Sequence, residues 1–201
     1  MEELEQIARE VAVCQACALS RTRHKTVPGS GDGHAAIMFI GEAPGYHEDQ
    51  QGKPFVGPAG QFLDELLASI GLKRENVFIA NVVKCRPPNN RDPQPDEIAA
   101  CDHFLQRQIA AIQPKVIVTL GRYSMAKFFS GETISRIHGR PRRQNGIIYF
   151  PLYHPAAALH QPALRRTIEE DFKKLPDLIA SVEDAVPEEQ PAETATQLPL
   201  F

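Results

Sequence analysis

The stretch that decides the fold reads "AAIMFIGEAPGYHEDQQGKPFVGPAG", residues 35–60. It begins as a short apolar run that predicts a buried strand, and it continues as a loop rich in glycine and proline. A glycine-rich turn after a strand commonly cradles phosphate. This loop has neither common phosphate-binding glycine spacing, and Glu42, Glu48 and Asp49 would repel a phosphate. We therefore expect a different ligand.

Short apolar runs of the same kind recur along the chain, and patterns typical of helices lie between them. Strands that alternate with helices and read as continuous apolar runs predict an α/β fold with a parallel sheet covered on both faces. The predicted strands are residues 36–40, 77–83, 116–120 and 147–153. The predicted helices are residues 2–12, 58–70, 96–112, 122–129 and 162–175.

Loops that leave the carboxyl ends of parallel strands form the ligand crevice of such a sheet. We expect four segments to converge there: residues 41–57, residues 81–90, the segment from Gly121 onward, and residues 154–159. The unusual polar residues of the sequence lie in or beside three of these four.

The composition is that of a globular protein. The 201 residues, 42% hydrophobic and 23% charged, suit one compact domain with a sizeable core. No uncharged apolar stretch approaches the roughly 18 residues of a membrane span, and the acidic residues 1–5 differ from a signal peptide. We expect a cytoplasmic monomer.

Positive charge is clustered although the net charge is −3. Five carboxylates between residues 183 and 193 have no lysine or arginine among them, so the rest of the chain is weakly basic. Arg136, Arg140, Arg142 and Arg143 form a local basic cluster that could bind a polyanion. A solvated charged strand edge explains this cluster equally well.

The four cysteines are Cys14, Cys17, Cys85 and Cys101. Structural disulfides are not expected in a cytosolic protein. A C-x₂-C turn and two further thiolates complete a four-sulfur metal site, and both zinc and an iron–sulfur cluster satisfy that count. The alternative is four unrelated buried cysteines. A metal would tie the N-terminal helix to the irregular loop "KCRPPNNRDPQP", residues 84–95.

Four motifs, together with the cysteines, resemble the iron–sulfur uracil-DNA glycosylases, the family 4 branch of that superfamily. They are "GEAPGYHED" (41–49), "PFVGPAG" (54–60), "NVVKCRPP" (81–88) and "HPAAAL" (154–159). The resemblance implies a three-layer αβα sandwich around a short, mainly parallel four-stranded sheet. It implies one [4Fe–4S] cluster per chain, held by the four cysteines, in a domain of residues 1–180. It also implies removal of uracil from single- or double-stranded DNA, in base-excision repair of deaminated cytosine.

The resemblance implies base-binding roles for three residues. Phe55 would stack on the flipped base, and its alternative is an ordinary core phenylalanine. The Asn81 amide would pair with uracil O4 and N3–H, and its alternative is a turn former at a strand end. His154 would donate a hydrogen bond to uracil O2, and its alternative is a helix cap.

The catalytic carboxylate is less clear. In family 1 relatives the corresponding stretch reads G-Q-D-P-Y-H, where Asp assists water and Tyr excludes the methyl group of thymine. Ala43 and Gly45 stand at those positions here. Glu42 and Glu48 are the candidates for handling water, and Glu48 could supply the bulk that Gly45 lacks near uracil C5. Alternatively, either glutamate orients the backbone of the loop.

Residues that contact the DNA around the base are expected in two places. Leu159 or His160 would wedge into the gap left by the flipped base, although helix-core packing explains Leu159 equally well. Phosphate contacts are expected from the basic cluster of four arginines, and from Arg86 and Arg91 near the cysteines. The alternative functions are a non-catalytic metal-containing DNA-binding module and another α/β nucleotide-processing enzyme.

Residues 181–201, "SVEDAVPEEQPAETATQLPLF", predict a disordered acidic tail. Its end resembles the short peptide with which bacterial repair and replication proteins bind the sliding clamp. Gln197, Leu198, Leu200 and Phe201 carry that resemblance. The apolar side chains would fill pockets on the clamp while the tail serves as a linker.

Deletion of residues 197–201 is expected to abolish binding to a bacterial sliding clamp and to leave uracil removal from a short oligonucleotide unchanged. Surface plasmon resonance against immobilised clamp measures the first, and an oligonucleotide cleavage assay measures the second. Unchanged clamp affinity would show that the peptide is not the docking element.

Overall fold

The computed structural model describes residues 2–183, which form an α/β sandwich around a six-stranded, mainly parallel sheet. The strand order is β1-β3-β2-β4-β6-β5. The strands are β1 (Ser30–Gly31), β2 (Ile37–Gly41), β3 (Phe78–Asn81), β4 (Val116–Leu120), β5 (Arg142–Gln144) and β6 (Ile147–Leu152). The predicted three-layer α/β architecture is confirmed.

The four predicted strands are the four parallel strands of the sheet, β2, β3, β4 and β6. The predicted count of four is corrected to six because a short antiparallel strand lies at each edge. Neither edge strand has an apolar pattern that sequence could reveal. β1 has only two residues, and β5 reads Arg-Arg-Gln with all three residues exposed.

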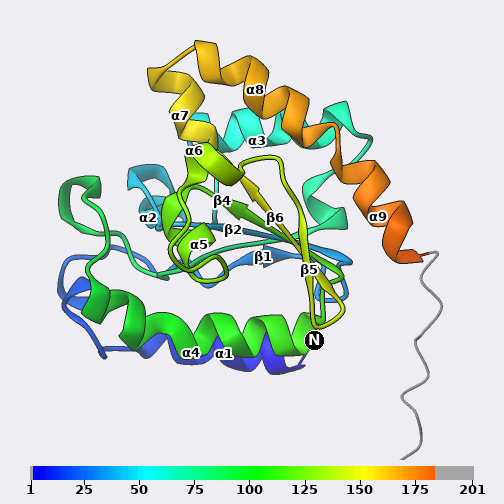
Figure 1. Cartoon of the computed structure of the whole chain (residues 1–201). Coiled ribbons are helices and arrows are strands. Elements are labelled where there is room, and N and C mark those ends of the chain that lie inside the picture. Colours follow the sequence, from blue (N-terminus) through cyan, green and yellow to red (C-terminus); the bar gives the residue numbers. More distant parts are fainter. Residues whose placement is uncertain (1, 184–201) are drawn as a thin grey trace, which may run out of the picture.

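Helices cover both faces of the sheet (Figure 1). One face carries α1 (Glu2–Val13) and α4 (Pro95–Ile112). The other carries α3 (Pro58–Ser69), α7 (Pro155–His160), α8 (Ala163–Phe172) and α9 (Leu175–Glu183). Short helices complete the chain: α2 (Tyr46–Gln51), α5 (Arg122–Ala126), α6 (Ile134–Ile137), η1 (Ala18–Arg21), η2 (Arg74–Asn76) and η3 (Pro88–Asn90). None of the helices within residues 2–183 is long and apolar enough to cross a membrane.

The C-terminal helical region differs from the prediction in its boundaries. The helix expected over residues 162–175 is α8, which ends at Phe172, and a further helix, α9, begins at Leu175. Helix α9 continues to Glu183, past residue 181 where the tail was expected to begin. Residues 184–201, which include the clamp-like peptide, lie outside the described part of the chain.

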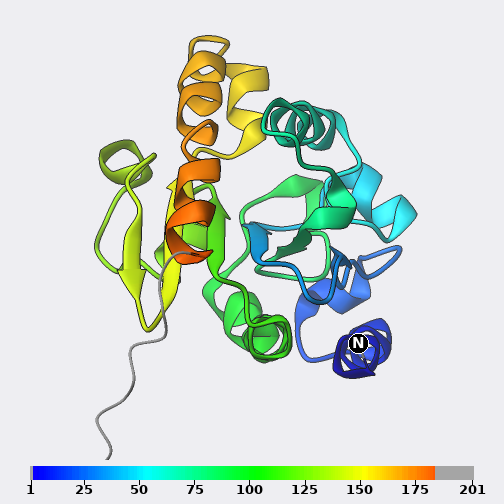
Figure 2. The same ribbon diagram turned by 90° about the vertical axis from the view of Figure 1, so that its right-hand side faces the viewer.

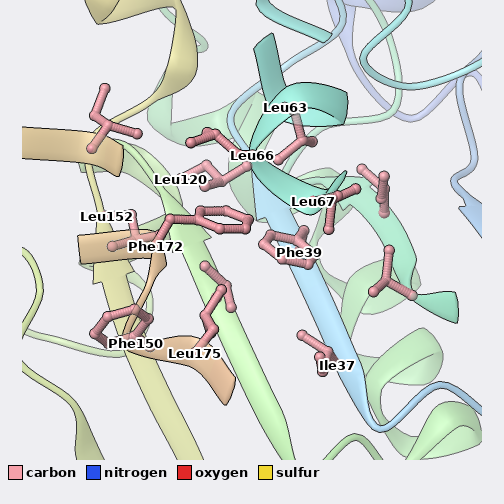
Figure 3. Packing of buried hydrophobic residues seen from close by; sticks show 14 of the residues in the cluster. Ile37, Phe39, Leu63, Leu66, Leu67, Leu120, Phe150, Leu152, Phe172 and Leu175 are labelled. Atoms are coloured by element: carbon pink, nitrogen blue, oxygen red, sulfur yellow. The ribbon is translucent and has the colours of Figure 1, made fainter. Parts of the chain in front are cut away.

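Two hydrophobic cores lie on opposite faces of the sheet, because side chains of a strand alternate between its faces. Phe39 of β2 faces the core under α3 and α8, whereas Met38 and Ile40 face the core above α1 and α4. The ring of Phe39 stacks on that of Phe172, with centroids 5.8 Å apart and both rings fully buried. Figure 3 shows this pair among the leucines of α3 and β4.

The strand order determines where a ligand binds. The chain moves from β2 to β3 on one side, and then returns past β2 to β4 and β6 on the other. The connections therefore diverge between the carboxyl ends of β2 and β4, which is the position where open α/β sheets bind ligands. Viewed after a 90° turn, the sheet lies between its two helical layers (Figure 2).

Phe172→Ala is expected to lower the free energy of unfolding by about 3–5 kcal/mol, because it removes a fully buried ring from the core. Urea denaturation followed by circular dichroism measures the loss. Leu159→Ala is the matched control: its side chain is exposed, so we expect a change within about 0.5 kcal/mol. Equal losses in the two variants would contradict the packing described here.

Candidate active site

The loops that follow β2, β3, β4 and β6 line one open cleft of about 800 Å³. The cleft brings together all six residues for which sequence predicted base binding or catalysis: Glu42, Ala43, Glu48, Phe55, Asn81 and His154. The predicted convergence of the four segments is therefore confirmed in the described residues.

Phe55 serves both the core and the cleft. Its side chain is 5% exposed and belongs to the core beside α3, yet it also lines the cleft. Its ring stacks on the imidazole of His154, with centroids 5.4 Å apart and planes 25° apart. The ring lies against Gly41, where an added Cβ would be 2.7 Å from it, so only glycine fits there.

Asn81 ends β3, directly opposite Gly41 in the register of the sheet. Its Oδ1 atom is buried and has no hydrogen-bond partner within residues 2–183. Its backbone carbonyl is fixed, because the buried ammonium of Lys84 donates to it at 2.8 Å. A buried amide oxygen without a partner at a cleft wall indicates a site built for a ligand that donates a hydrogen bond.

His154 caps helix α7. Its Nδ1 atom accepts a hydrogen bond from the backbone N–H of Ala156 at 3.1 Å, so Nε2 carries the proton of the neutral ring. Burial lowers the pKa of His154 to about 4, and the nearby Glu48 carboxylate opposes this shift. His154 therefore caps α7, as one of the sequence alternatives stated, and a neutral N–H donor remains at Nε2.

Glu48 accepts hydrogen bonds from three backbone N–H groups of the loop. Its Oε2 atom accepts from Gly45 at 3.1 Å, and Oε1 accepts from Val56 and Gly57, both at 3.0 Å. A Cβ at Gly45 would lie 2.8 Å from Oε2, so the carboxylate fills the space beside this glycine. Glu48 thus orients the backbone of the loop, as one of the sequence alternatives stated.

Glu42 lies in the same cleft in a different environment. Burial raises the pKa of its carboxyl to about 7, with a further increase from Asp92 and a decrease from Arg122. Asp92 and Arg122 form an ion pair that joins the loop after β3 to the start of α5. Because its pKa lies near neutrality, Glu42 can act as a proton acceptor at physiological pH.

The four cysteines line a second cavity, between α1, η1 and α4. None of them forms a disulfide. Two of the sulfurs accept hydrogen bonds: Cys85 from Arg23 Nη1 at 3.2 Å, and Cys101 from the backbone N–H of Lys84 at 3.3 Å. Within residues 2–183, no three histidine, cysteine or acidic side chains are close enough together to hold a single metal ion.

Lys84 connects the cysteine cavity to the cleft. Its side chain is 1% exposed and lines the cavity, and burial lowers its pKa to about 8. Its ammonium donates to Asn81 O and to Gln108 Oε1, the latter at 2.7 Å. One buried residue therefore contacts both sites.

Comparison with known proteins gives the family. A profile described as "Uracil DNA glycosylase superfamily" matches residues 28–175. The chain belongs to this superfamily. A type-4 uracil-DNA glycosylase of Sulfurisphaera tokodaii is 53% identical over 89% of this chain and 86% of its own length. One of Archaeoglobus fulgidus is 49% identical over 89% and 94%, and one of Thermotoga maritima is 46% identical over 89% and 96%.

The four arginines of the basic cluster do not all face the same way, because two of them belong to strand β5. Arg136, Arg140 and Arg142 line a separate hollow of about 260 Å³. Arg143 instead donates to the backbone carbonyl of Ser181 in α9 at 3.4 Å. Neighbouring residues of a strand face opposite sides, which explains the division of Arg142 from Arg143.

The other residues predicted to contact DNA lie near the cleft, and other side chains already bind two of them. Arg91 is engaged by the buried Glu97 in a two-pronged ion pair, with N···O distances of 2.6 and 2.9 Å. Arg86 lies over the ring of Tyr46 and donates to Asn90.

Leu159 is 49% exposed, so its core-packing alternative is wrong, and His160 lines the cleft. Sequence analysis missed Arg122, although it directly follows Gly121 after β4.

Glu48→Ala is expected to lower the free energy of unfolding by about 1.5–3 kcal/mol, because three N–H groups lose a charged acceptor. Hydrogen exchange should accelerate at the amides of Gly45, Val56 and Gly57, as measured by NMR. Glu48→Gln is the matched variant. Its amide oxygen can still accept from Val56 and Gly57, so we expect faster exchange at Gly45 alone. Unchanged exchange in both variants would contradict this role.

Proposed function

We propose that this chain is a uracil-DNA glycosylase, which flips uracil out of DNA and hydrolyses its N-glycosidic bond in base-excision repair of deaminated cytosine. The observation that carries the proposal is the buried Oδ1 of Asn81, which has no hydrogen-bond partner among residues 2–183 and lies in a cleft with the rings of Phe55 and His154. Relatives that cover nearly the same length are named type-4 uracil-DNA glycosylases, and this supports the same substrate.

Base selection rests on the Asn81 amide. Its oxygen accepts a hydrogen bond from uracil N3–H, and its NH₂ group donates to O4. Cytosine presents an amino group in place of O4, so two donors would face each other. The space left by Gly41 fits the amide closely, since an added Cβ would lie 2.4 Å from Oδ1. The Phe55 ring supplies the stacking surface, worth about 1–3 kcal/mol per base.

Departure of the base rests on His154. Negative charge develops on uracil O2 as the N1–C1′ bond breaks, and the Nε2–H group donates to it. A neutral imidazole serves this purpose, in agreement with the low pKa of His154 and the bond that fixes its Nδ1. Loss of one such preorganised donor costs about 2.7–4 kcal/mol of transition-state stabilisation.

The two glutamates have separate roles. Glu42 orients the attacking water and accepts its proton, which is supported by its position in the cleft and its raised pKa. Glu48 holds the loop through three N–H groups, and its carboxylate restricts the space beside Gly45 near uracil C5. Glu48 thereby excludes thymine, because the C5 methyl group of thymine would occupy the same space. Ala43 contributes to the wall of the same cleft.

The DNA strand is held outside the cleft. Arg86, Arg140, Arg142 and Arg143 contact phosphates, with a smaller contribution from Arg91, because the buried Glu97 already binds its guanidinium through two hydrogen bonds. Leu159 enters the stack as the wedge, which its exposure at the end of α7 supports. Both single- and double-stranded DNA are substrates.

One [4Fe–4S] cluster fits the donor set of Cys14, Cys17, Cys85 and Cys101. All four cysteines line one cavity, and the resemblance to the iron–sulfur uracil-DNA glycosylases favours a cluster over a zinc ion there. The N–H groups of Arg23 and Lys84 supply the outer hydrogen bonds that cluster sulfurs require. The cluster acts as a structural crosslink between α1 and the loop of residues 84–95.

We further propose that the protein is a cytoplasmic monomer and that residues 197–201 form a clamp-binding peptide.

A single assay separates the candidate functions. Purified protein is incubated with oligonucleotides that contain one uracil and then treated with alkali. Strand breakage at uracil alone, lost in Asn81→Ala, supports the glycosylase. Binding without breakage indicates the DNA-binding module, and uracil release from dUMP alone indicates a nucleotide-processing enzyme. Iron and sulfide analysis tests the cluster.

The pH dependence of kcat/KM tests Glu42. The wild-type value is expected to fall as pH drops below about 7, because a protonated carboxyl cannot accept a proton from water. His154, with its pKa near 4, stays neutral and contributes nothing between about pH 5.5 and 7. Glu42→Gln should therefore be slower and independent of pH over that range. An unchanged acidic limb in this variant would exclude Glu42 as the titrating group.

A further inference from the structure

The backbone of Phe55 is strained. Its φ angle is 52°, a left-handed conformation that is a genuine outlier for a bulky aromatic residue. Such a conformation persists only where several contacts of the surrounding structure enforce it together. The strain turns the Phe55 carbonyl toward helix α3, where an added Cβ at Gly60 would lie only 1.8 Å from the oxygen.

Arg74 binds the backbone at this point. Its guanidinium donates to the carbonyl of Pro54 at 2.9 Å, to that of Phe55, and to that of Gly60 at 3.5 Å. Its Nε atom donates to the Asp64 carboxylate at 2.5 Å, which fixes the orientation of the planar group. One side chain thus binds the carbonyl of the strained residue, the carbonyl that precedes it, and a carbonyl of helix α3, against which Phe55 packs.

The opposite side of the same turn is held by Glu48. Arg74 binds the carbonyl groups of residues 54 and 55, and Glu48 binds the amides of residues 56 and 57. The two charged groups hold the turn from opposite sides and leave the Phe55 ring on Gly41 and His154. Since Arg74 begins η2, just before β3, the turn is also tied to the strand that ends in Asn81.

A DNA-phosphate contact is the obvious alternative for a partly exposed arginine. The contacts of Arg74 argue against it, because three carbonyl oxygens and one carboxylate already engage its fork of donors. Its side chain is only 31% exposed. A phosphate would have to compete with acceptors that the folded chain supplies.

We propose that Arg74 is a positioning residue that holds Phe55 in its strained conformation, and so places the ring as the platform on which the flipped base stacks. This inference rests on the proposed glycosylase function. It assigns Arg74 no contact with DNA and no part in the chemical step.

The test is a double-mutant cycle of Arg74→Met and Phe55→Ala, measured as the single-turnover rate on uracil-containing DNA. Arg74→Met is expected to slow the wild-type enzyme about 10- to 100-fold, because a misplaced ring loses its stacking. In the Phe55→Ala background the same change should slow the reaction less than about twofold, since no ring remains to be placed. Equal slowing in both backgrounds would overturn the proposal.

Two further variants separate positioning from charge. Arg74→Lys keeps the charge but lacks the fork that reaches three carbonyls, so we expect it to resemble Arg74→Met. Arg166→Met removes an arginine whose side chain is 87% exposed and pairs with Glu170, and it should leave the rate unchanged. The salt dependence of DNA binding should be the same in Arg74→Met and wild type. A slope smaller by about one would indicate a phosphate contact and overturn the proposal.

Asp64→Asn covers the case in which Arg74→Met does not fold. Asp64 is 48% exposed, and its replacement loosens only the Nε anchor of Arg74. A smaller slowing that again disappears in the Phe55→Ala background is expected, and an additive effect would count against the proposal. Wild-type protein that does not act on uracil in DNA would refute the proposed function instead. Active wild type with fully active Arg74→Met would refute this inference alone.

Discussion

The missing side chain at Gly41 is the constraint on which the site depends. Gly41 ends β2 in the middle of the sheet, and both Asn81 Oδ1 and the Phe55 ring occupy the space that a Cβ would take. An alanine here would displace the amide and the ring together. The sheet register therefore sets the distance between the two groups that face a ligand. The strained turn at Phe55 brings the ring to a position that the strand end has already determined.

Two glutamates six residues apart have opposite electrostatic environments. Glu48 is surrounded by N–H groups, which satisfy a carboxylate and make it part of the scaffold. Burial, and to a smaller extent the nearby Asp92 carboxylate, raises the pKa of the Glu42 carboxyl to about 7. Sequence alone could not separate these roles, because the difference lies in which backbone amides fold back onto each side chain. Residues 56 and 57 reach Glu48 only after the chain has turned at Phe55.

The strands that carry a continuous apolar pattern could be predicted, and so could the residues at their carboxyl ends, since parallel strands end at one edge of the sheet. β1 and β5 could not be predicted, because pairing with a neighbour makes them strands while their own residues are polar or too few. Arg74 and Arg122 were missed for a related reason. Their partners are backbone carbonyls and a distant aspartate, which no local spacing reveals.

The stacking of Phe39 on Phe172 has a consequence for the order of folding during synthesis. Phe39 emerges early in translation, whereas α8 and the helix capped by His154 are made near the end of the described chain. A domain generally folds as a unit, and the chain is synthesised at about 5–20 residues per second. The face of the sheet that carries α3 therefore stays only partly covered on the ribosome until α8 arrives. A nascent chain would contain Asn81 before it contains His154, and the apolar surface exposed in the interval would be prone to aggregation.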